Sequence, residues 1–449
     1  MTWRRAVAPL LALTVALVLA DSAVVTLALP DILVHLQTTV AQVAWVLIAF
    51  NLVLGLAAVP SAVVLARLHP QVLTALGIAA FAGSSAWCAA AGSIEVLIAA
   101  RCLQALGGAF ALLGCLELLV AVYGERRGVA TWVVAGVVGT ATGPVAGGLL
   151  TQAFSWQAIF VVQVPCAALA VPAALAVRGV PVQPPDRHRP ALRPNLALAL
   201  LSAALTAALF LLVLLLVEGW RRSPATAAVT VSVVPLAALA ARPLARLLRP
   251  PQEVEVAVGC FLIAGGLTGL AIPPSAHLAW TIAPQALVGL GLGLTVDRLT
   301  TSAMELRLPR VRHAGWTIGA RHVGVVLGLA ILTPVFTADL MDAQVPAQEA
   351  ITSLVLDAPL QPEDKIAVAR ALGDELTSQQ GRIPDLHHAF ATLDVAPSER
   401  AATDRLEQDL DAQLTRAATR AFRDSFLIGA GLALLALVVV VVPRRREPS

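Results

Sequence analysis

Residues 7–30 read VAPLLALTVALVLADSAVVTLALP, an almost unbroken apolar stretch with one charged side chain, Asp21. About 20 consecutive apolar residues are enough for a helix to cross the hydrocarbon core of a bilayer. Similar runs recur along the chain, of whose 449 residues 58% are hydrophobic and only 13% are charged. So few charged side chains cannot cover a soluble protein of this size, and the short alternating strands of a membrane barrel are absent. The composition therefore predicts an all-α integral membrane protein.

The apolar runs predict about twelve membrane-spanning helices, six on each side of a polar connector rich in Pro and Arg. We therefore expect an N-terminal six-helix bundle at 1–178, a cytoplasmic linker at 179–194, and helices 7–11 of a C-terminal bundle at 195–340. Residues 341–422 contain charged amphipathic stretches and are predicted to form a helical insertion outside the cytoplasm. Helix 12 and a cytoplasmic tail are predicted at 423–449.

The distribution of arginine predicts the orientation of the chain. Alternate breaks between the apolar runs carry the basic residues: 67, 126–127, 178–193, 242–249, 307–312 and 444–446. The opposite breaks at 31–42, 92–95, 155 and 272–277 contain no Lys or Arg, and Arg221 and Arg222 are the main exception on that side. Because cytoplasmic loops carry an excess of basic residues, we predict a multi-pass protein of the cell (plasma or inner) membrane with both termini in the cytoplasm.

Three motifs carry a family resemblance. The first predicted helix ends in LADSAVVTLALPDI at 19–32, the fourth contains LIAARCLQALGGAF at 97–110, and the fifth contains GTATGPVAGGLL at 139–150. Together they resemble the signatures of the drug:proton antiporter branch (multidrug efflux type) of the major facilitator superfamily. The fourth helix is similar to the pattern R-x-x-Q-G-x-G, and the fifth matches the antiporter pattern G-x-x-x-G-P-x-x-G-G at Gly139, Gly143, Pro144, Gly147 and Gly148.

The resemblance implies a major facilitator fold, with two six-helix transmembrane bundles related by pseudo-twofold symmetry around a central cavity. It implies a secondary active transporter, not an enzyme, that couples efflux of small hydrophobic or amphipathic compounds to protons. The expected partners are a small-molecule or lipid-like substrate, protons and membrane lipids, without nucleic acid, cofactor or metal. We expect a monomer. The chain has no G-x-x-x-x-G-K-[ST] phosphate loop, so ATP is not the expected energy source.

Two other functions fit the sequence. The charged segment 341–422 would suit an exporter of a lipid or envelope component, with the segment guiding cargo outside the membrane. A degenerate, non-transporting binding protein is suggested by the loop after the second helix. There the family pattern has a gate Asp, and this chain has Ala66, followed by Arg67.

Asp21 is the candidate proton-coupling residue. It lies roughly 13 Å from the outer end of the first helix, where a carboxylate is costly unless it is paired or faces water. Burial favours its protonated form. Arg101 lies at a similar depth, about 9 Å from the outer end of the fourth helix, and favours the charged form of Asp21. These opposing effects suit a proton switch, but a permanent packing pair is the alternative interpretation.

Asn51, Gln104, Arg321 and His322 are candidates for the cavity or the substrate site. Gln104 follows Arg101 by one turn and faces the same way. Asn51 falls at a similar depth, and Arg321 and His322 fall about 12 Å inside the eleventh helix. Hydrogen-bonded packing between helices is the alternative role for these side chains.

The glycines of the fifth-helix motif are expected to let a neighbouring backbone approach closely, and Pro144 is expected to bend the helix. The resulting interface could seal one side of the protein during transport. A Gly143→Leu substitution is expected to block this packing.

Overall fold

The computed structural model describes residues 2–178, 180, 188–248, 250–304, 307–378, 390 and 399–442. These parts are almost entirely helical and contain no strand. They include 12 spans that are long and apolar enough to cross a membrane. The predicted all-α fold and the predicted number of spans are therefore confirmed.

The first six spans form one bundle, and short local signals set where its helices begin and end. Thr39 caps the second helix by a reciprocal pair of hydrogen bonds with Gln42. Gly124, with φ of 80°, makes the tight turn between the fourth and fifth helices in a conformation that favours glycine. The helices are α1 (Thr2–His35), α2 (Val40–Arg67), α3 (Pro70–Ala89), α4 (Ile94–Tyr123), α5 (Glu125–Ala153), α6 (Ala158–Ala168) and α7 (Ala170–Ala176).

The last six spans form the second bundle, and several of its spans are built from two or more helical segments. Two π-helical segments interrupt the seventh span, and such segments are frequent at functional sites. The elements are α8 (Leu192–Thr206), η1 (Ala207–Leu211), α9 (Leu212–Leu214), η2 (Leu215–Gly219), α10 (Pro224–Val231), α11 (Val233–Leu248), α12 (Gln252–Ala271), α13 (Ala279–Met304), α14 (Arg310–Asp357) and α18 (Arg423–Val441).

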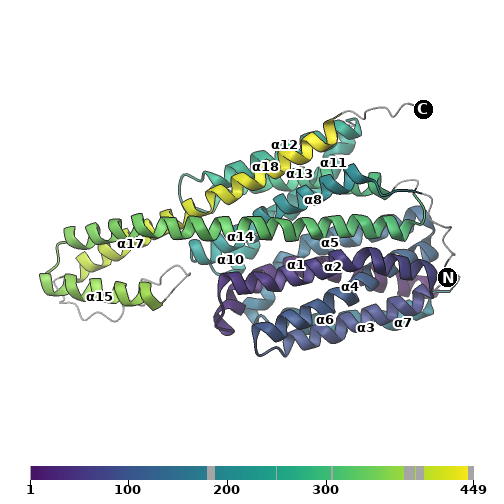
Figure 1. The fold of residues 1–449 in the computed structure, drawn as a ribbon, viewed down its shortest axis with the longest axis horizontal. Coiled ribbons are helices and arrows are strands. Elements are labelled where there is room, and N and C mark those ends of the chain that lie inside the picture. The colour runs from purple at the N-terminus through teal and green to yellow at the C-terminus, as the bar shows by residue number, and fades with distance from the viewer. Residues whose placement is uncertain are drawn as a thin grey trace.

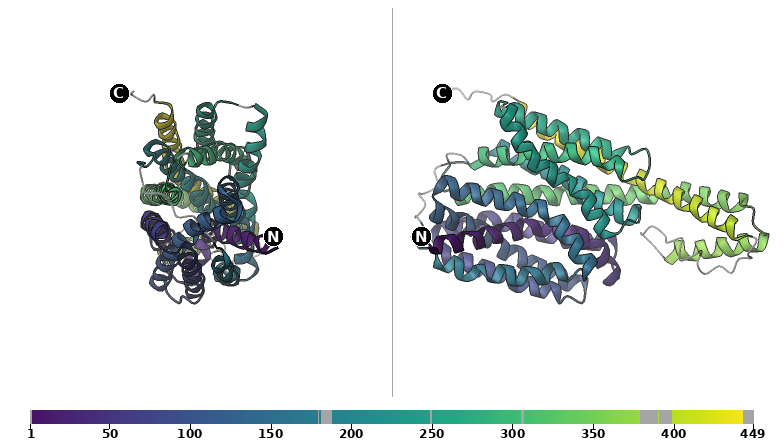
Figure 2. Two further views of the ribbon diagram at one scale, coloured as in Figure 1. Left: turned by 90° about the vertical axis from the view of Figure 1, so that its right-hand side faces the viewer. Right: turned by 180° about the vertical axis from the view of Figure 1, so that it is seen from behind.

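The two bundles lie side by side, and a helical hairpin projects from one end of the molecule (Figures 1 and 2). The bundles meet where α2 packs against α14 and α5 packs against α10. α1 begins and α18 ends at the opposite end from the hairpin (Figure 1). We call these two ends of the molecule the hairpin end and the termini end.

The hairpin consists of the end of α14 together with α15 (Pro362–Ser378) and α17 (Arg400–Ala421). It has a small apolar core of its own, which includes Val368, Leu372 and Leu410. α14 runs through residue 340, where we expected helix 11 to end, without a break. The indole nitrogen of Trp220, which follows η2, donates to the Thr419 hydroxyl of α17 at 2.9 Å. The hairpin is therefore attached to the C-terminal bundle.

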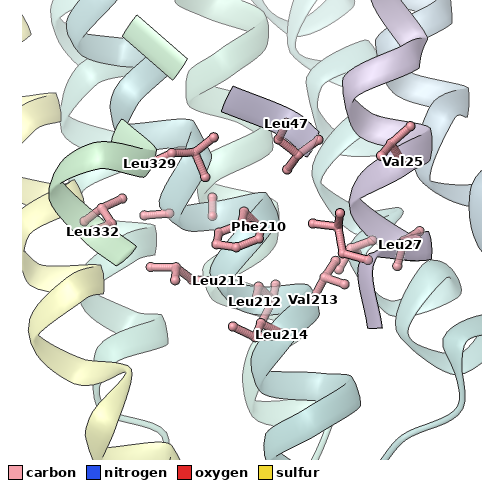
Figure 3. Close-up of a cluster of buried hydrophobic side chains, with 14 of the residues drawn as sticks. Val25, Leu27, Leu47, Phe210, Leu211, Leu212, Val213, Leu214, Leu329 and Leu332 are labelled. Carbon is pink, nitrogen blue, oxygen red and sulfur yellow. The ribbon is translucent and has the colours of Figure 1, made fainter. Parts of the chain in front are cut away.

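An apolar cluster closes the gap between the bundles at the hairpin end (Figure 3). Its central members are Leu27 and Leu47 from the N-terminal bundle and Phe210, Val213 and Leu329 from the C-terminal bundle, all buried. We call these five residues the hairpin-end cluster. Every α1 residue from 23 to 30 is buried, whereas Leu13, nearer the termini end, is 37% exposed. The bundles are thus closed at the hairpin end.

The fifth-helix glycines bring α5 against α1. A Cβ atom added at Gly139 would overlap the carbonyl oxygen of Ala16, and one added at Gly147 would overlap that of Val24. A Cβ at Gly143 would lie 3.0 Å from the Ala20 carbonyl oxygen, a milder conflict. The closest backbone approach is therefore at Gly139 and Gly147, on either side of the position that we singled out from the sequence.

We predict that Gly139→Ala destabilises the protein more than Gly143→Ala does. The first adds a methyl group against a backbone carbonyl that cannot rotate away, and overpacking of this kind costs about 1–3 kcal/mol. Thermal unfolding of the purified variants in detergent measures the difference. Gly83→Ala is the control, because nothing lies within 4 Å of its added Cβ. Equal melting temperatures for the Gly139 and Gly83 variants would contradict the proposed close approach.

Candidate functional site

Asp21 of α1 and Arg101 of α4 form a fully buried ion pair. Arg101 Nη1 donates to Asp21 Oδ2, and both side chains are 0% exposed. Arg101 Nε donates to the Val46 carbonyl oxygen at 3.3 Å, and the guanidinium carbon lies 4.1 Å from the centroid of the Phe50 ring. The structure therefore brings together the two residues that the sequence selected for proton coupling.

Two glutamines and a serine complete the network around this pair. Gln104 Oε1 accepts from Arg101 Nη1 at 2.6 Å, and Gln163 Nε2 of α6 donates to Asp21 Oδ1 at 2.9 Å. Gln104 Nε2 lies 2.9 Å from Gln163 Oε1 and 2.8 Å from the Ser85 hydroxyl of α3. Our sequence analysis missed Ser85 and Gln163. The only signal for Gln163 was one amide in the otherwise apolar run IFVVQVP at 159–165.

The two charges in this network balance each other. With Asp21 ionised, the Arg101 charge is balanced, and the glutamines saturate the carboxylate. A proton on Asp21 would remove that balance and leave a positive guanidinium in a dry site, which is costly. Arg101 Nη2 is already buried without a hydrogen-bond partner. The ion pair therefore holds α4 against α1 in this structure.

A second polar cluster includes Ser22, the residue that follows Asp21 on α1. The Ser22 hydroxyl donates to Asn51 Oδ1 at 3.3 Å, and His322 Nδ1 of α14 lies 2.7 Å from the same oxygen. Because an amide oxygen only accepts, His322 carries its hydrogen on Nδ1 in this contact. Asn51 Nδ2 donates to the Leu47 carbonyl oxygen at 2.9 Å. This cluster links the two bundles across α2 and α14.

A cavity of about 140 Å³, large enough for several waters, lies between the bundles. The hairpin-end cluster contributes Leu47, Phe210 and Leu329 to its wall, so the cavity reaches the closed end of the gap. The polar residues that line it are Ser22, Thr26, Asn51, Thr140, Ser202, Thr206, Arg321 and His322. Three of the four residues expected at the cavity therefore lie in its wall, and Gln104 lies in the ion-pair network instead.

Two further contacts join the bundles. A Cβ at Gly148 of α5 would overlap the side chain of Ala228 on α10, so this motif glycine lies at the interface between the bundles. At the termini end, Arg310 of α14 pairs with Glu125 of α5 at 2.5 Å.

Pro144 is buried within α5, which continues through it as one helix. Arg67, in the loop without the gate Asp, is exposed.

The comparisons with known proteins agree on one family. The family model for the Major Facilitator Superfamily matches residues 11–333. The tetracenomycin C resistance and export protein of Streptomyces glaucescens is 32% identical over 169 residues, 37% of this chain and 31% of that protein. The multidrug efflux pump LfrA of Mycolicibacterium smegmatis is 34% identical over 159 residues, covering 34% and 32% of the two chains. The matches thus cover about a third of the length of these relatives.

The fold has solved counterparts that cover nearly the whole chain. A bacterial homologue of the human lysosomal transporter Spinster, in its inward-facing and occupied conformation, superposes with a TM-score of 0.63 and 17% identity. The alignment covers 98% of this chain and 96% of that chain. The likeness shows that the two proteins share a fold.

We predict that Asp21 and Arg101 are energetically coupled. Arg101→Gln leaves a buried carboxylate without its counter-charge and should cost about 3–5 kcal/mol of unfolding free energy. The double variant Asp21→Asn/Arg101→Gln should lose less than the sum of the two single variants, because neither charge remains. Unfolding of the four proteins in mixed micelles measures the cycle. Additive losses would show that the pair does not interact in the folded protein.

Proposed function

Because the chain belongs to the major facilitator superfamily, we propose that it is a secondary active transporter that exports small hydrophobic or amphipathic compounds in exchange for protons. The printed names of its relatives, a resistance and export protein and a multidrug efflux pump, support efflux. The observation that carries the proposal is the buried Asp21–Arg101 pair, one residue from the wall of the cavity between the bundles.

In this proposal the hairpin end faces outward and both termini lie in the cytoplasm. The arginine distribution supports that orientation, since the hairpin end and the termini end are on opposite sides of the spans (Figure 1). The closed hairpin-end cluster then seals the outer side, and the cavity receives its substrate from the cytoplasm. One chain supplies both bundles around the cavity, so a monomer in the cell membrane is sufficient.

Proton exchange proceeds through Asp21. When the outer side opens, Asp21 takes a proton, its pairing with Arg101 weakens, and α1 can shift against α4. Ser22 moves with α1, because it is the residue that follows Asp21. The Ser22 hydroxyl contacts Asn51, and Asn51 in turn contacts His322 of α14. The cavity wall therefore changes when the carboxylate changes charge. Return to the cytoplasmic side releases the proton and restores the ion pair.

The remaining sequence candidates have supporting roles in this mechanism. Asn51, Arg321 and His322 contact substrate in the cavity, and Gln104 orients the ion pair. The glycines of α5 and Pro144 form the tight interface on which α1 moves. The two alternatives, envelope-lipid export and a non-transporting binding protein, are not favoured by relatives that are named as export and efflux proteins.

We predict that Asp21→Asn abolishes proton-driven export, because an amide of the same shape cannot carry a proton between the two sides. Export of a panel of neutral, cationic and anionic amphipathic compounds from proteoliposomes, with the accompanying proton movement, measures this. Asp31→Asn is the matched control. Asp31 is also on α1, but it lies at the hairpin end, where it accepts from the Trp156 backbone nitrogen at 3.3 Å. Coupled export that persists in the Asp21 variant would refute the assigned role.

We predict that deletion of residues 346–419 leaves drug export within about twofold of the intact protein. The deleted hairpin has its own core, and Phe336 and Phe422 remain in contact at its base with ring centroids 4.3 Å apart. Export by the shortened protein, compared at equal amounts in the membrane, tests this. Loss of export in a correctly folded deletion variant would favour a direct role of the hairpin in cargo delivery.

A further inference from the structure

Arg321 is the one permanently charged side chain among the described residues that line the cavity. That lining contains no Asp, Glu or Lys, and it combines hydroxyl, amide and imidazole groups with apolar side chains. Arginine remains charged at any physiological pH. The cavity therefore has a fixed positive charge that no acidic residue in its wall offsets.

The two arginines deep in the bundles differ in their partners. Arg101 is fully buried and neutralised by Asp21. In the part of the chain that the structure describes, neither an ion pair nor a hydrogen bond involves the Arg321 side chain. An unpaired charge within a membrane span is costly unless it faces a water-filled space, and such residues mark substrate and ion pathways. Arg321 is half-buried, and the cavity is the space that its side chain lines and that could hold water.

The chemistry around Arg321 defines what would bind there. A guanidinium group presents a planar set of N–H donors that matches the two oxygens of a carboxylate. The Ser202 and Thr206 hydroxyls line the same cavity and can also donate, whereas Phe210 and Leu329 provide apolar surface. A cation in this space would be repelled. The complementary ligand has an anionic oxygen group on an apolar body.

We propose that the transported compounds are amphipathic organic anions whose carboxylate or similar oxyanion group binds Arg321 in the cavity. This inference rests on the proposed function, since it names the substrate class of the same cavity. The bound anion supplies the negative charge that no described residue of the cavity wall places beside Arg321. Selection for anions is therefore separate from the proton step at Asp21, which keeps its own counter-charge in Arg101.

Equilibrium dialysis of the detergent-purified full-length protein tests the proposal with two pairs of ligands. Indole-3-acetate is compared with indole-3-acetamide, and 1-naphthylacetate with 1-naphthylacetamide, so that each pair differs in the anionic group and little else. We expect each acid to bind at least about tenfold more tightly than its amide, as for a charge-assisted contact in a partly dry site. Arg321→Gln should abolish this preference, and Arg321→Lys should retain part of it.

Arg222→Gln is the matched control, because it removes one positive charge from an exposed position at the hairpin end. It should keep the full preference for acids. Equal binding of acids and amides by the intact protein, binding of neither, or an unchanged preference in a folded Arg321→Gln protein would overturn the proposal. If the intact protein binds acids more tightly than amides but shows no proton-driven export, the proposed function is contradicted and the anion site stands.

Discussion

The buried ion pair between Asp21 and Arg101 is the constraint on which the N-terminal bundle depends. Two opposite charges with no solvent exposure can persist only because each is balanced by the other and by amide groups from α4 and α6. The pair joins α1, α2, α4 and α6 at one point. Loss of either charge would leave the other buried without its counter-charge, which is costly in a site with no solvent exposure.

α1 is the element that links this pair to the rest of the molecule. Asp21 points into the N-terminal bundle, Ser22 lines the cavity, and Val24 carries the carbonyl against which Gly147 of α5 packs. A helix held on one side by backbone contacts and on another by a titratable pair has few ways to move. The glycines of α5 thus act together with the ion pair in fixing the position of α1, because they let the two helix backbones lie in close contact.

α14 plays the corresponding part in the C-terminal bundle. It packs along α2, contributes Arg321 and His322 to the cavity and Leu329 to the hairpin-end cluster, and continues into the hairpin as a single helix. A shift of α14 would therefore change the cavity, the hairpin-end cluster and the hairpin together. The positively charged cavity and the ion pair, whose charges balance, are separate electrostatic units, so in the proposed mechanism substrate selection and proton exchange use different residues.

The sequence by itself determined the membrane class, the number of spans and the family, because these depend on long apolar runs and on local motifs that need no partner. It also identified Asp21 and Arg101, since a charge inside an apolar run is conspicuous. Only the tertiary structure decided what these residues contact. Ser85 and Gln163 joined the ion pair from other helices, and Gln104 turned out to serve that pair instead of the cavity. Among the described residues Arg321 has no ion-pair or hydrogen-bond partner, and this was likewise invisible in the sequence, because pairing depends on which helix faces lie together.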